Sequence, residues 1–275
     1  MTMSQPDLDA AAPKVELRAV SKRFDSKKHQ LSVLDQISIE AAAEEFVSII
    51  GPSGCGKSTM FNIITGLEQP SAGDVLVDGS PVTGHGEHFA YMPQKDLLFP
   101  WRRVIDNTTL GLEVQGTNRR DARRRAAPLF ETFGLEGFER HYPWQLSGGM
   151  RQRAALLRTV VQDRSILLLD EPFGALDSLT RTEMQEWMMG VWEQFRWTVL
   201  LITHDIREAI FLSDRVYVLT ARPASVRLVV DVELERPRSL NVAREQHFLD
   251  LESRLMEALR EESRRSQLGE LPTVE

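Results

Sequence analysis

One segment of the chain has the residue types and spacing of a phosphate-binding loop. Residues 51–59 fit the pattern G-x-x-x-x-G-K-[ST], with an additional glycine at Gly54. In such a loop the backbone N–H groups surround a chain of phosphates, Lys57 reaches the β- and γ-phosphates, and the Ser58 hydroxyl is a ligand for Mg²⁺. We therefore expect nucleotide contacts from Gly51, Pro52, Ser53, Gly54, Cys55, Gly56, Lys57, Ser58 and Thr59.

The residues around this loop predict the elements that would position it. Phe46–Ile50 is a short apolar run typical of a buried strand, and the apolar residues from Thr59 to Ile64 open a helix that ends at Gly66. A strand, a glycine turn and a helix together direct backbone N–H groups and the positive end of the helix dipole at an anion. The alternative, a glycine-rich turn without a ligand, does not explain the full match in this context.

A second segment supplies acidic residues. Ser165–Leu169 predicts a strand buried on both faces, and Asp170 and Glu171 follow at its carboxyl end, where open α/β sheets bind ligands. We expect Asp170 to hold Mg²⁺, mainly through water, and Glu171 to orient or deprotonate an attacking water. A helix cap or a solvated turn is the alternative for both acids. His204 ends a third apolar strand in the same way, so it would converge on the same edge of the sheet.

A third segment, Ser147-Gly148-Gly149, predicts the start of a helix. A serine N-cap would explain Ser147 alone. Two successive glycines cost roughly 1 kcal/mol each inside a helix. Their presence indicates that something approaches this backbone closely.

The chain resembles the ATP-binding-cassette family from about Val15 to Arg222. The resemblance rests on the phosphate loop together with Leu146-Ser147-Gly148-Gly149-Met150 and Leu169-Asp170-Glu171-Pro172. The resemblance implies an α/β fold, with a P-loop NTPase (RecA-like) core, an antiparallel β subdomain and an inserted helical lobe. It also implies two composite ATP sites in a dimer. In each site Ser147, Gly148 and Gly149 of one subunit would close over the γ-phosphate held by the phosphate loop of the other.

The same resemblance assigns four further residues. Gln94 would contact Mg²⁺ and the water and report nucleotide state to a membrane partner; an ordinary loop amide is its alternative. Phe24 would stack on adenine, although a lone aromatic near a first strand is more often a core residue. Asp177 would communicate between the two sites, a role that is compatible with a helix N-cap. His204 would contact the γ-phosphate, so the expected catalytic residues are Glu171, His204, Lys57 and Gln94.

Composition narrows the class of protein. With 275 residues and 42% hydrophobic content, the chain can bury one core with two lobes. Its formal charge of −7 argues against general nucleic-acid binding. The basic run 119–125 is expected to be a solvated helix face, with contact to lipid headgroups or a partner as the alternative.

Two absences point to a cytosolic location. The single cysteine, Cys55, excludes an intrachain disulfide, which suits a reducing compartment. An adduct on its thiol would block the nucleotide. Nothing approaches the roughly 20 apolar residues needed to cross a bilayer, and the polar start lacks the apolar core of a signal peptide. We therefore expect a soluble chain, with any channel formed by another polypeptide.

The order of motifs gives the organisation. We expect a flexible leader over residues 1–14, an ATPase domain over 15–225 with its helical lobe at about 96–160, and an extension over 226–275. Turn signals stand at Asp78-Gly79 and at Gly84-His85-Gly86. Pro128 should kink or shorten a helix that runs over 122–133. Phe248, Leu251, Leu255 and Leu259 predict an amphipathic helix docked on the core, with Glu261 and Arg265 spaced for an ion pair.

Three segments are similar to ATPases of importers for nitrate, sulfonates, taurine and related small solutes: Leu97-Leu98-Phe99-Pro100-Trp101, Leu146–Arg153 and Asp170–Asp177. The short ending with Ala221-Arg222-Pro223, after the last core strand, indicates the same subgroup. This resemblance implies ATP and Mg²⁺ as ligands and a homodimer or a dimer with a related cassette. It also implies membrane permease subunits, a solute-binding protein reached through the permease, and a peripheral position at the cytoplasmic face of the cell membrane. The alternatives are an ATPase for lipid or lipoprotein export or for a cell-division complex, and a scaffold that binds nucleotide without turnover.

Overall fold

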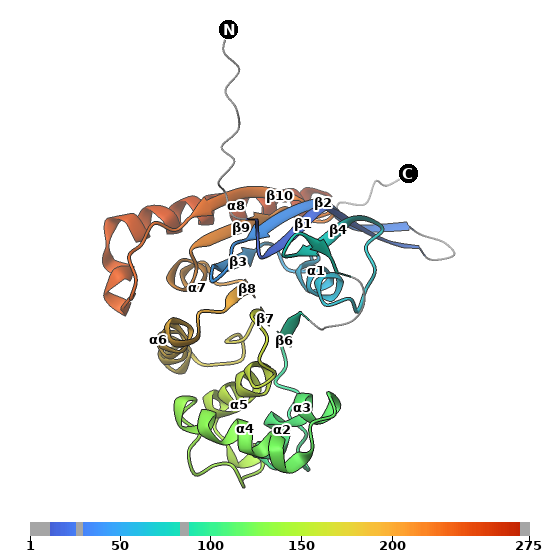
Figure 1. The fold of residues 1–275 in the computed structure, drawn as a ribbon. Helices are drawn as coiled ribbons and strands as arrows, with labels where there is room; N and C mark the ends of the chain where they lie inside the picture. The colour runs from blue at the N-terminus through green and yellow to red at the C-terminus, as the bar shows by residue number, and fades with distance from the viewer. Residues whose placement is uncertain (1–11, 26–29, 83–87, 270–275) are drawn as a thin grey trace, which may run out of the picture.

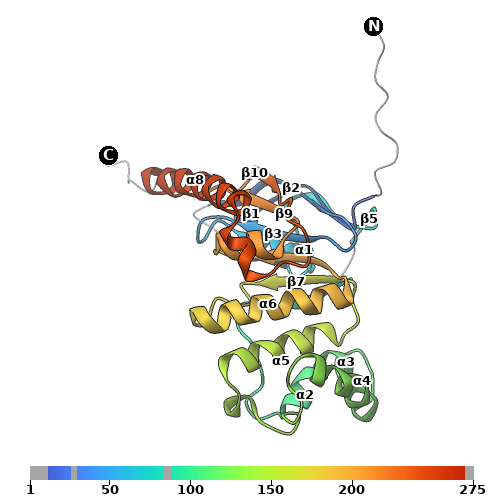
Figure 2. The ribbon, with the colours of Figure 1, turned by 90° about the vertical axis from the view of Figure 1, so that its left-hand side faces the viewer.

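The computed structural model describes residues 12–25, 30–82 and 88–269. Most of the expected leader over 1–14, and the turn signal at Gly84-His85-Gly86, lie outside the described residues. In the rest of the chain the expected α/β architecture is present, with two sheets and a separate group of helices (Figures 1 and 2).

The larger sheet carries the predicted motif strands side by side. It has the order β10-β9-β3-β8-β7-β6, and all neighbours are parallel except β10 and β9. Every residue of β3, β7 and β8 is buried, which is why these strands are mostly apolar. Because the strands are parallel, the loops after them emerge at one edge. The strands are β3 (Phe46–Ile50), β6 (Phe89–Met92), β7 (Ile166–Asp170), β8 (Thr198–Ile202), β9 (Arg215–Leu219) and β10 (Val226–Asp231).

A smaller antiparallel sheet packs over one face of the larger one. Its order is β2-β1-β4-β5, from β1 (Val15–Asp25), β2 (Gln30–Ala41), β4 (Ala72–Val77) and β5 (Ser80–Pro81). The expected turn at Asp78-Gly79 joins β4 to β5 with positive φ at both residues. Helix α1 (Lys57–Ile64) shares a core with this sheet through Met60 and Phe61, which are fully buried. The helix that follows the phosphate loop is thus held from both sides.

All the elements between β6 and β7 are helical, as expected for a lobe inserted in the core. They form the lower part of the molecule in Figure 1: α2 (Val104–Thr108), α3 (Leu110–Val114), α4 (Arg119–Thr132), a 3-10 turn η1 (Pro143–Gln145) and α5 (Gly148–Val160).

The expected shortening of α4 at Pro128 is wrong. The helix continues past the proline to Thr132. Ala122, Ala126 and Phe130 on this helix are buried in the lobe, so tertiary packing outweighs the lost backbone hydrogen bond. The basic run on α4 is also not simply solvated, because Arg119 and Arg123 pair with the buried carboxylate of Asp106 at 2.7 and 2.6 Å.

The remaining helices lie on the other face of the large sheet and along the molecule's upper edge in Figure 2. They are α6 (Ser178–Phe195), α7 (Ile206–Leu212), η2 (Leu240–Arg244) and α8 (Gln246–Gly269). The predicted docking of α8 on the core is confirmed, since Phe248, Leu251 and Leu255 are buried in it. In the described part of the chain no helix has the length and apolar character required to cross a membrane.

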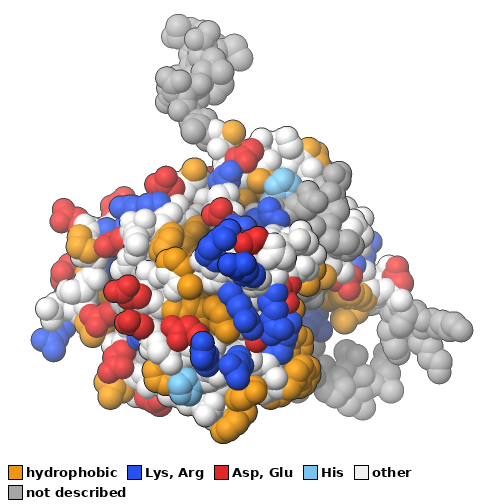
Figure 3. All heavy atoms as spheres, turned by 60° about the horizontal axis from the view of Figure 1, so that its bottom comes forward, with side chains coloured by type: hydrophobic (Ala, Val, Ile, Leu, Met, Phe, Trp, Pro, Cys, Tyr) orange, Lys and Arg blue, Asp and Glu red, His pale blue; other side chains and the backbone are white. Residues whose placement is uncertain are grey.

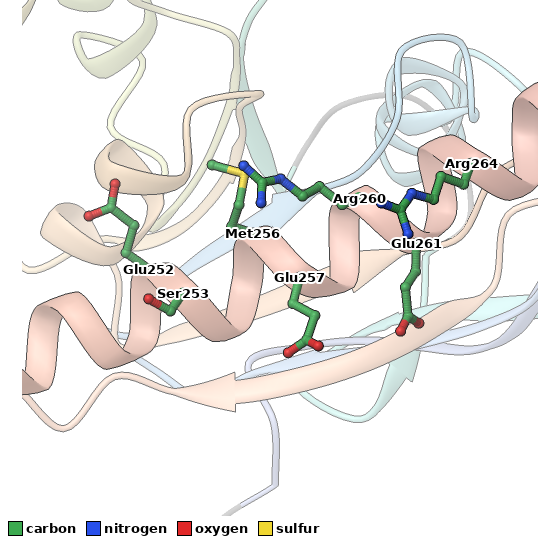
Figure 4. Close-up of a pocket in the computed structure, with 7 residues that line it drawn as sticks. All are labelled: Glu252, Ser253, Met256, Glu257, Arg260, Glu261 and Arg264. Carbon is green, nitrogen blue, oxygen red and sulfur yellow. The ribbon is translucent and has the colours of Figure 1, made fainter.

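The ion pairs of α8 differ from the expected one. Arg265 pairs with Glu262 at 3.1 Å, whereas Glu261 pairs with Arg227 on β10. Figure 4 shows Glu261 among the polar side chains along α8. The reason is that β10 runs beside this helix and brings an arginine closer than the next turn does.

Candidate functional site

A cleft of about 680 Å³ opens at the carboxyl edge of the large sheet. This volume lies in the range of small-molecule sites. The cleft collects residues from widely separated parts of the sequence, as expected from the strand order. The predicted residues that line it are Phe24, Ser53, Gly54, Gly56, Lys57, Ser58, Thr59, Gln94, Glu171 and His204.

Hydrogen bonds from Lys57 and the space around Gly56 define the shape of the phosphate loop. The buried Lys57 ammonium donates hydrogen bonds to the carbonyl oxygens of Gly51 and Pro52, at 2.8 and 3.0 Å. Gly56 has φ +122°, and a Cβ atom there would lie 2.7 Å from Cγ1 of Val33. Only glycine meets both conditions, so the spacing of the motif has a direct geometric cause.

Cys55 lies inside this loop, facing the core and not the cleft. It is 2% exposed, and burial raises the pKa of its thiol. A thiol that is buried and protonated is a poor nucleophile. The structure therefore favours the view of Cys55 as a small residue that fits the turn.

Asp170 carries a buried carboxylate at the end of β7. It is 4% exposed, and burial raises its pKa, partly offset by hydrogen bonding from Ser58. Tyr91 approaches it with an O···O distance of 3.4 Å, and burial together with Asp170 raises the pKa of Tyr91 to about 12. Among the described residues Asp170 has no Lys, Arg or His in an ion pair. This donor set of oxygens from Ser58, Gln94 and Asp170 fits Mg²⁺, which prefers oxygen ligands and completes its shell with water and substrate phosphates.

Glu171 is the point where three strand ends meet. Its Oε2 atom accepts a hydrogen bond from Nε2 of Gln94 at 3.0 Å and lies 3.3 Å from Nδ1 of His204. The backbone N–H of Glu171 donates to Ile202 O at 2.9 Å, which fixes the residue with φ +47°. The predicted convergence of the phosphate loop, Glu171 and His204 at one edge is thus present in the structure, and Gln94 lies with them.

The Ser147 segment lies away from this cleft in the same chain. Ser147 is the N-cap of α5 and accepts from the N–H of Met150 at 3.2 Å. A Cβ atom on Gly149 would lie 3.1 Å from Cγ2 of Thr180, so packing against α6 explains that glycine. A Cβ atom on Gly148 would make only ordinary contact, at 3.4 Å from Leu176. The described intrachain neighbours therefore give no reason for Gly148.

Asp177 and Phe24 have the local surroundings expected of them. Asp177 is the N-cap of α6, where its carboxylate accepts from the N–H of Thr180 at 3.1 Å, and this hydrogen bond holds its pKa low. Asp177 does not line the cleft. Phe24 ends on the surface at the cleft rim, 39% exposed, with the Lys22 ammonium 4.8 Å from its ring centroid.

Sequence reasoning missed several residues at the cleft, including Leu31 and Val33 on β2. Arg222 also lines the cleft directly, and Tyr91 touches Asp170 beneath it. Tyr91 could have been found, since it lies on the strand before Gln94. Arg222 follows β9 by three residues, and no local pattern marks it as a ligand of the nucleotide.

Comparison with known proteins adds the family. A family model described as "ABC transporter" matches residues 34–174, which is about half of the chain. The chain belongs to the ABC transporter family. The cassette is 41% identical over 254 residues to an uncharacterized ABC transporter ATP-binding protein of Methanocaldococcus jannaschii, covering 92% of this chain and 94% of that one.

Two relatives have printed functions. The cassette is 40% identical to the aliphatic sulfonates import ATP-binding protein of Bacillus cereus, covering 82% of this chain and 89% of that one. It is 43% identical to the formylaminopyrimidine import ATP-binding protein of Halalkalibacterium halodurans, covering 85% and 92%.

Solved structures agree on the fold. A dimeric ABC transporter cassette superposes with a TM-score of 0.69 at 30% identity, covering 80% of this chain and all of that one. A second structure of that cassette, with the same score, is a post-hydrolysis state bound to ADP and phosphate. The chain described here is accordingly an ABC ATPase cassette that binds and hydrolyses ATP.

Proposed function

We propose that this cassette is the ATP-hydrolysing subunit of an importer for a small solute of the sulfonate, nitrate or taurine kind, acting through a separate membrane permease. The observation that carries the ATPase part is the meeting of Gln94, Glu171 and His204 beside the phosphate loop. The importer part is supported by the printed functions of the relatives with about 40% identity.

In the proposed reaction the predicted residues of the cleft divide the tasks of binding and catalysis. Lys57 and the N–H groups of the phosphate loop bind the β- and γ-phosphates, and Phe24 stacks on adenine. Glu171 accepts a proton from the attacking water, Gln94 orients that water, and His204 donates a hydrogen bond to the γ-phosphate. Bound Mg²⁺, held by Ser58, Gln94 and Asp170, would balance negative charge on the phosphates.

The site is completed by a second cassette in a head-to-tail dimer. Ser147, Gly148 and Gly149 lie outside the cleft of their own chain, and the intrachain neighbours leave Gly148 unexplained. A phosphate bound on the partner subunit would meet the N-terminus of α5 there, which favours an anion. Asp177, next to this segment at the start of α6, would carry the state of one site to the other.

A route from the cleft to the permease runs through the loop after Gln94. Arg158 on α5 donates to the carbonyl oxygens of Asp96 and Leu97, at 2.6 and 2.9 Å. The loop therefore links Glu171 at one end to the Ser147 helix at the other. A shift of Glu171 or of the helix that begins at Ser147 would therefore also move the other.

The same loop and lobe expose apolar side chains. Leu97 is 57% exposed, Trp101 73% and Trp144 69%. The space-filling view of this end of the molecule has hydrophobic side chains beside a group of Lys and Arg (Figure 3). Exposed large apolar groups mark interaction surfaces. We propose that the permease docks here, which would hold the cassette at the cytoplasmic face of the cell membrane, with the solute-binding protein reached through the permease.

Substitution of the proposed base tests the function. Glu171→Gln keeps the shape and the hydrogen bond from Gln94 but removes the proton acceptor. We expect ATP hydrolysis to fall by at least about 100-fold, while ATP binding is retained and sizing detects a dimer with Mg-ATP. Unchanged hydrolysis together with no nucleotide-dependent dimer would contradict both the role of Glu171 and the composite site.

A further inference from the structure

An arginine that the sequence did not predict as a nucleotide contact lies against the phosphate loop. Arg222 stands in the connection between β9 and β10, and β9 is the parallel neighbour of β3. Because β3 leads into the phosphate loop, both segments emerge at the same edge of the sheet. Figure 1 shows β3 and β9 side by side.

The contact is made by the guanidinium group. Nε of Arg222 donates to the carbonyl oxygen of Gly54 at 3.1 Å, and Nη2 donates to the same oxygen. The side chain also lines the cleft, where Lys57 is the other Lys or Arg among the described lining residues. In the described part of the chain no carboxylate forms an ion pair with Arg222.

A guanidinium has five N–H donors, and one carbonyl oxygen occupies only part of this set. The remaining N–H groups and the full positive charge stay available to an anion in the cleft. A planar fork of this kind suits phosphate oxygens. The chemistry of Arg222 therefore matches a polyphosphate held by the loop it touches.

The backbone around Arg222 is fixed on two sides. On one side, the N–H of Ala224 donates to Val33 O at 2.9 Å, which ties the turn to β2. On the other, the N–H of Ala221 donates to Oε2 of Glu262 on α8 at 3.1 Å. Glu262 is 2% exposed and also accepts from Arg227 at 2.7 Å and from Arg265 at 3.1 Å. The C-terminal helix thus anchors the residue that precedes Arg222.

We propose that Arg222 is a second cationic ligand of the nucleotide's phosphate chain, positioned by Glu262 of α8. This inference rests on the proposed function, because it requires that the cleft binds ATP. It assigns the C-terminal helix a part in nucleotide affinity that the phosphate loop alone would not need.

The test is a titration of the full-length chain in EDTA, by competition of ATP, ADP and adenosine against a fluorescent ATP analogue. For Arg222→Ala and Arg222→Gln we expect ATP and ADP to bind about tenfold more weakly, which equals about 1.4 kcal/mol. Arg222→Lys keeps the charge but loses the planar fork, so it should bind ATP more tightly than Arg222→Gln and more weakly than the unaltered chain. Adenosine should bind equally to all. Arg124→Ala, which removes an exposed arginine of the helical lobe, is the matched control and should change nothing.

The outcomes separate the possible roles. If Arg222→Gln binds ATP as well as the unaltered chain, or if adenosine binding weakens as much as ATP binding, Arg222 serves only to hold Gly54 and the proposal is wrong. If the unaltered chain binds no ATP, the proposed function is wrong, and this result is distinguishable from a failure of the Arg222 proposal alone.

A double-mutant cycle tests the positioning by Glu262. Glu262→Gln should weaken ATP binding when Arg222 is present and have no further effect in Arg222→Ala. Equal effects in both backgrounds would overturn the role of α8. Thermal unfolding of each chain without nucleotide identifies any variant whose loss of binding comes from unfolding.

Discussion

Glu171 has a backbone conformation that few non-glycine residues adopt. Its φ of +47° is held by the hydrogen bond from its N–H to Ile202 O and by Gly174, whose N–H donates to Glu171 O at 3.2 Å. Such conformations cost roughly 1–3 kcal/mol and occur often where a side chain must be directed at a reaction. Here the conformation carries the carboxylate to Gln94 and His204 instead of letting it continue the strand direction.

Gly56 gives a prediction about the phosphate loop. Gly56→Ala should lower the free energy of unfolding by about 3 kcal/mol and weaken ATP binding, because the new Cβ atom meets Val33 and the backbone is strained. Urea unfolding and an ATP titration measure the two effects.

Gly79→Ala is the control for that prediction. Gly79 has φ +74°, but a Cβ atom there would meet nothing within 4 Å. Gly79→Ala should lower the free energy of unfolding by only about 1 kcal/mol, from backbone strain alone, and should leave ATP binding unchanged. Equal losses at both positions would show that the space around Gly56 is not limiting.

Among the elements, α6 begins at a residue with two possible tasks. Asp177→Ala removes the cap and should lower the unfolding temperature by a few degrees. Asp177→Asn keeps the cap, since asparagine caps as well as aspartate does. If Asp177 also acts across the dimer through its charge, ATP hydrolysis falls in both variants. Full activity in Asp177→Asn would leave only the capping role.

The contact between α6 and α7 makes a prediction about pH. Glu208 is 3% exposed and accepts from Gln185 at 2.9 Å, and burial raises its pKa from 4.5 to about 7. The folded chain therefore holds a proton that the unfolded chain releases. The stabilisation by this group is complete below pH 4.5 and is lost as the pH rises to 7, by up to about 3 kcal/mol.

Glu208→Gln stays neutral at every pH. Urea unfolding at pH 5 and pH 8 should find that this variant gains stability relative to the unaltered chain as the pH rises. Glu257→Gln, at an exposed position of α8, should show no such gain. A difference between Glu208→Gln and the unaltered chain that does not change with pH would contradict the raised pKa.

For the whole molecule, the composite site predicts complementation between two inactive chains. Lys57→Ala removes the phosphate ligand of the loop, and Gly148→Asp sets a carboxylate where a partner's γ-phosphate would approach. Each chain alone should be inactive. In a dimer of the two, one site keeps both intact parts, so a mixture should regain up to about a quarter of full activity. A mixture that stays inactive, although mixed dimers form, would contradict a site shared between subunits.

Much of the site could be predicted from the sequence, because it depends on local rules. The phosphate loop, the strand before Asp170 and the helix opening at Ser147 are each encoded in a run of fewer than ten residues. Glycines with positive φ, apolar strands and an N-cap serine act through neighbouring backbone atoms, so their signals are readable without the fold. The parallel sheet then follows, and it brings the strand ends to one edge.

Contacts between residues far apart in the chain could not be predicted from the sequence. Arg222 contacts Gly54 across 168 positions. Arg119 and Arg123, on a helix face that the sequence alone presents as solvated, form ion pairs with the buried Asp106. Helix α4 passes Pro128 because buried packing compensates for a local defect. Such outcomes depend on the relative positions of whole elements, which no local pattern of residues contains. The ion pair of Arg227 with Glu261, in place of one within α8, has the same cause: β10 lies beside the helix.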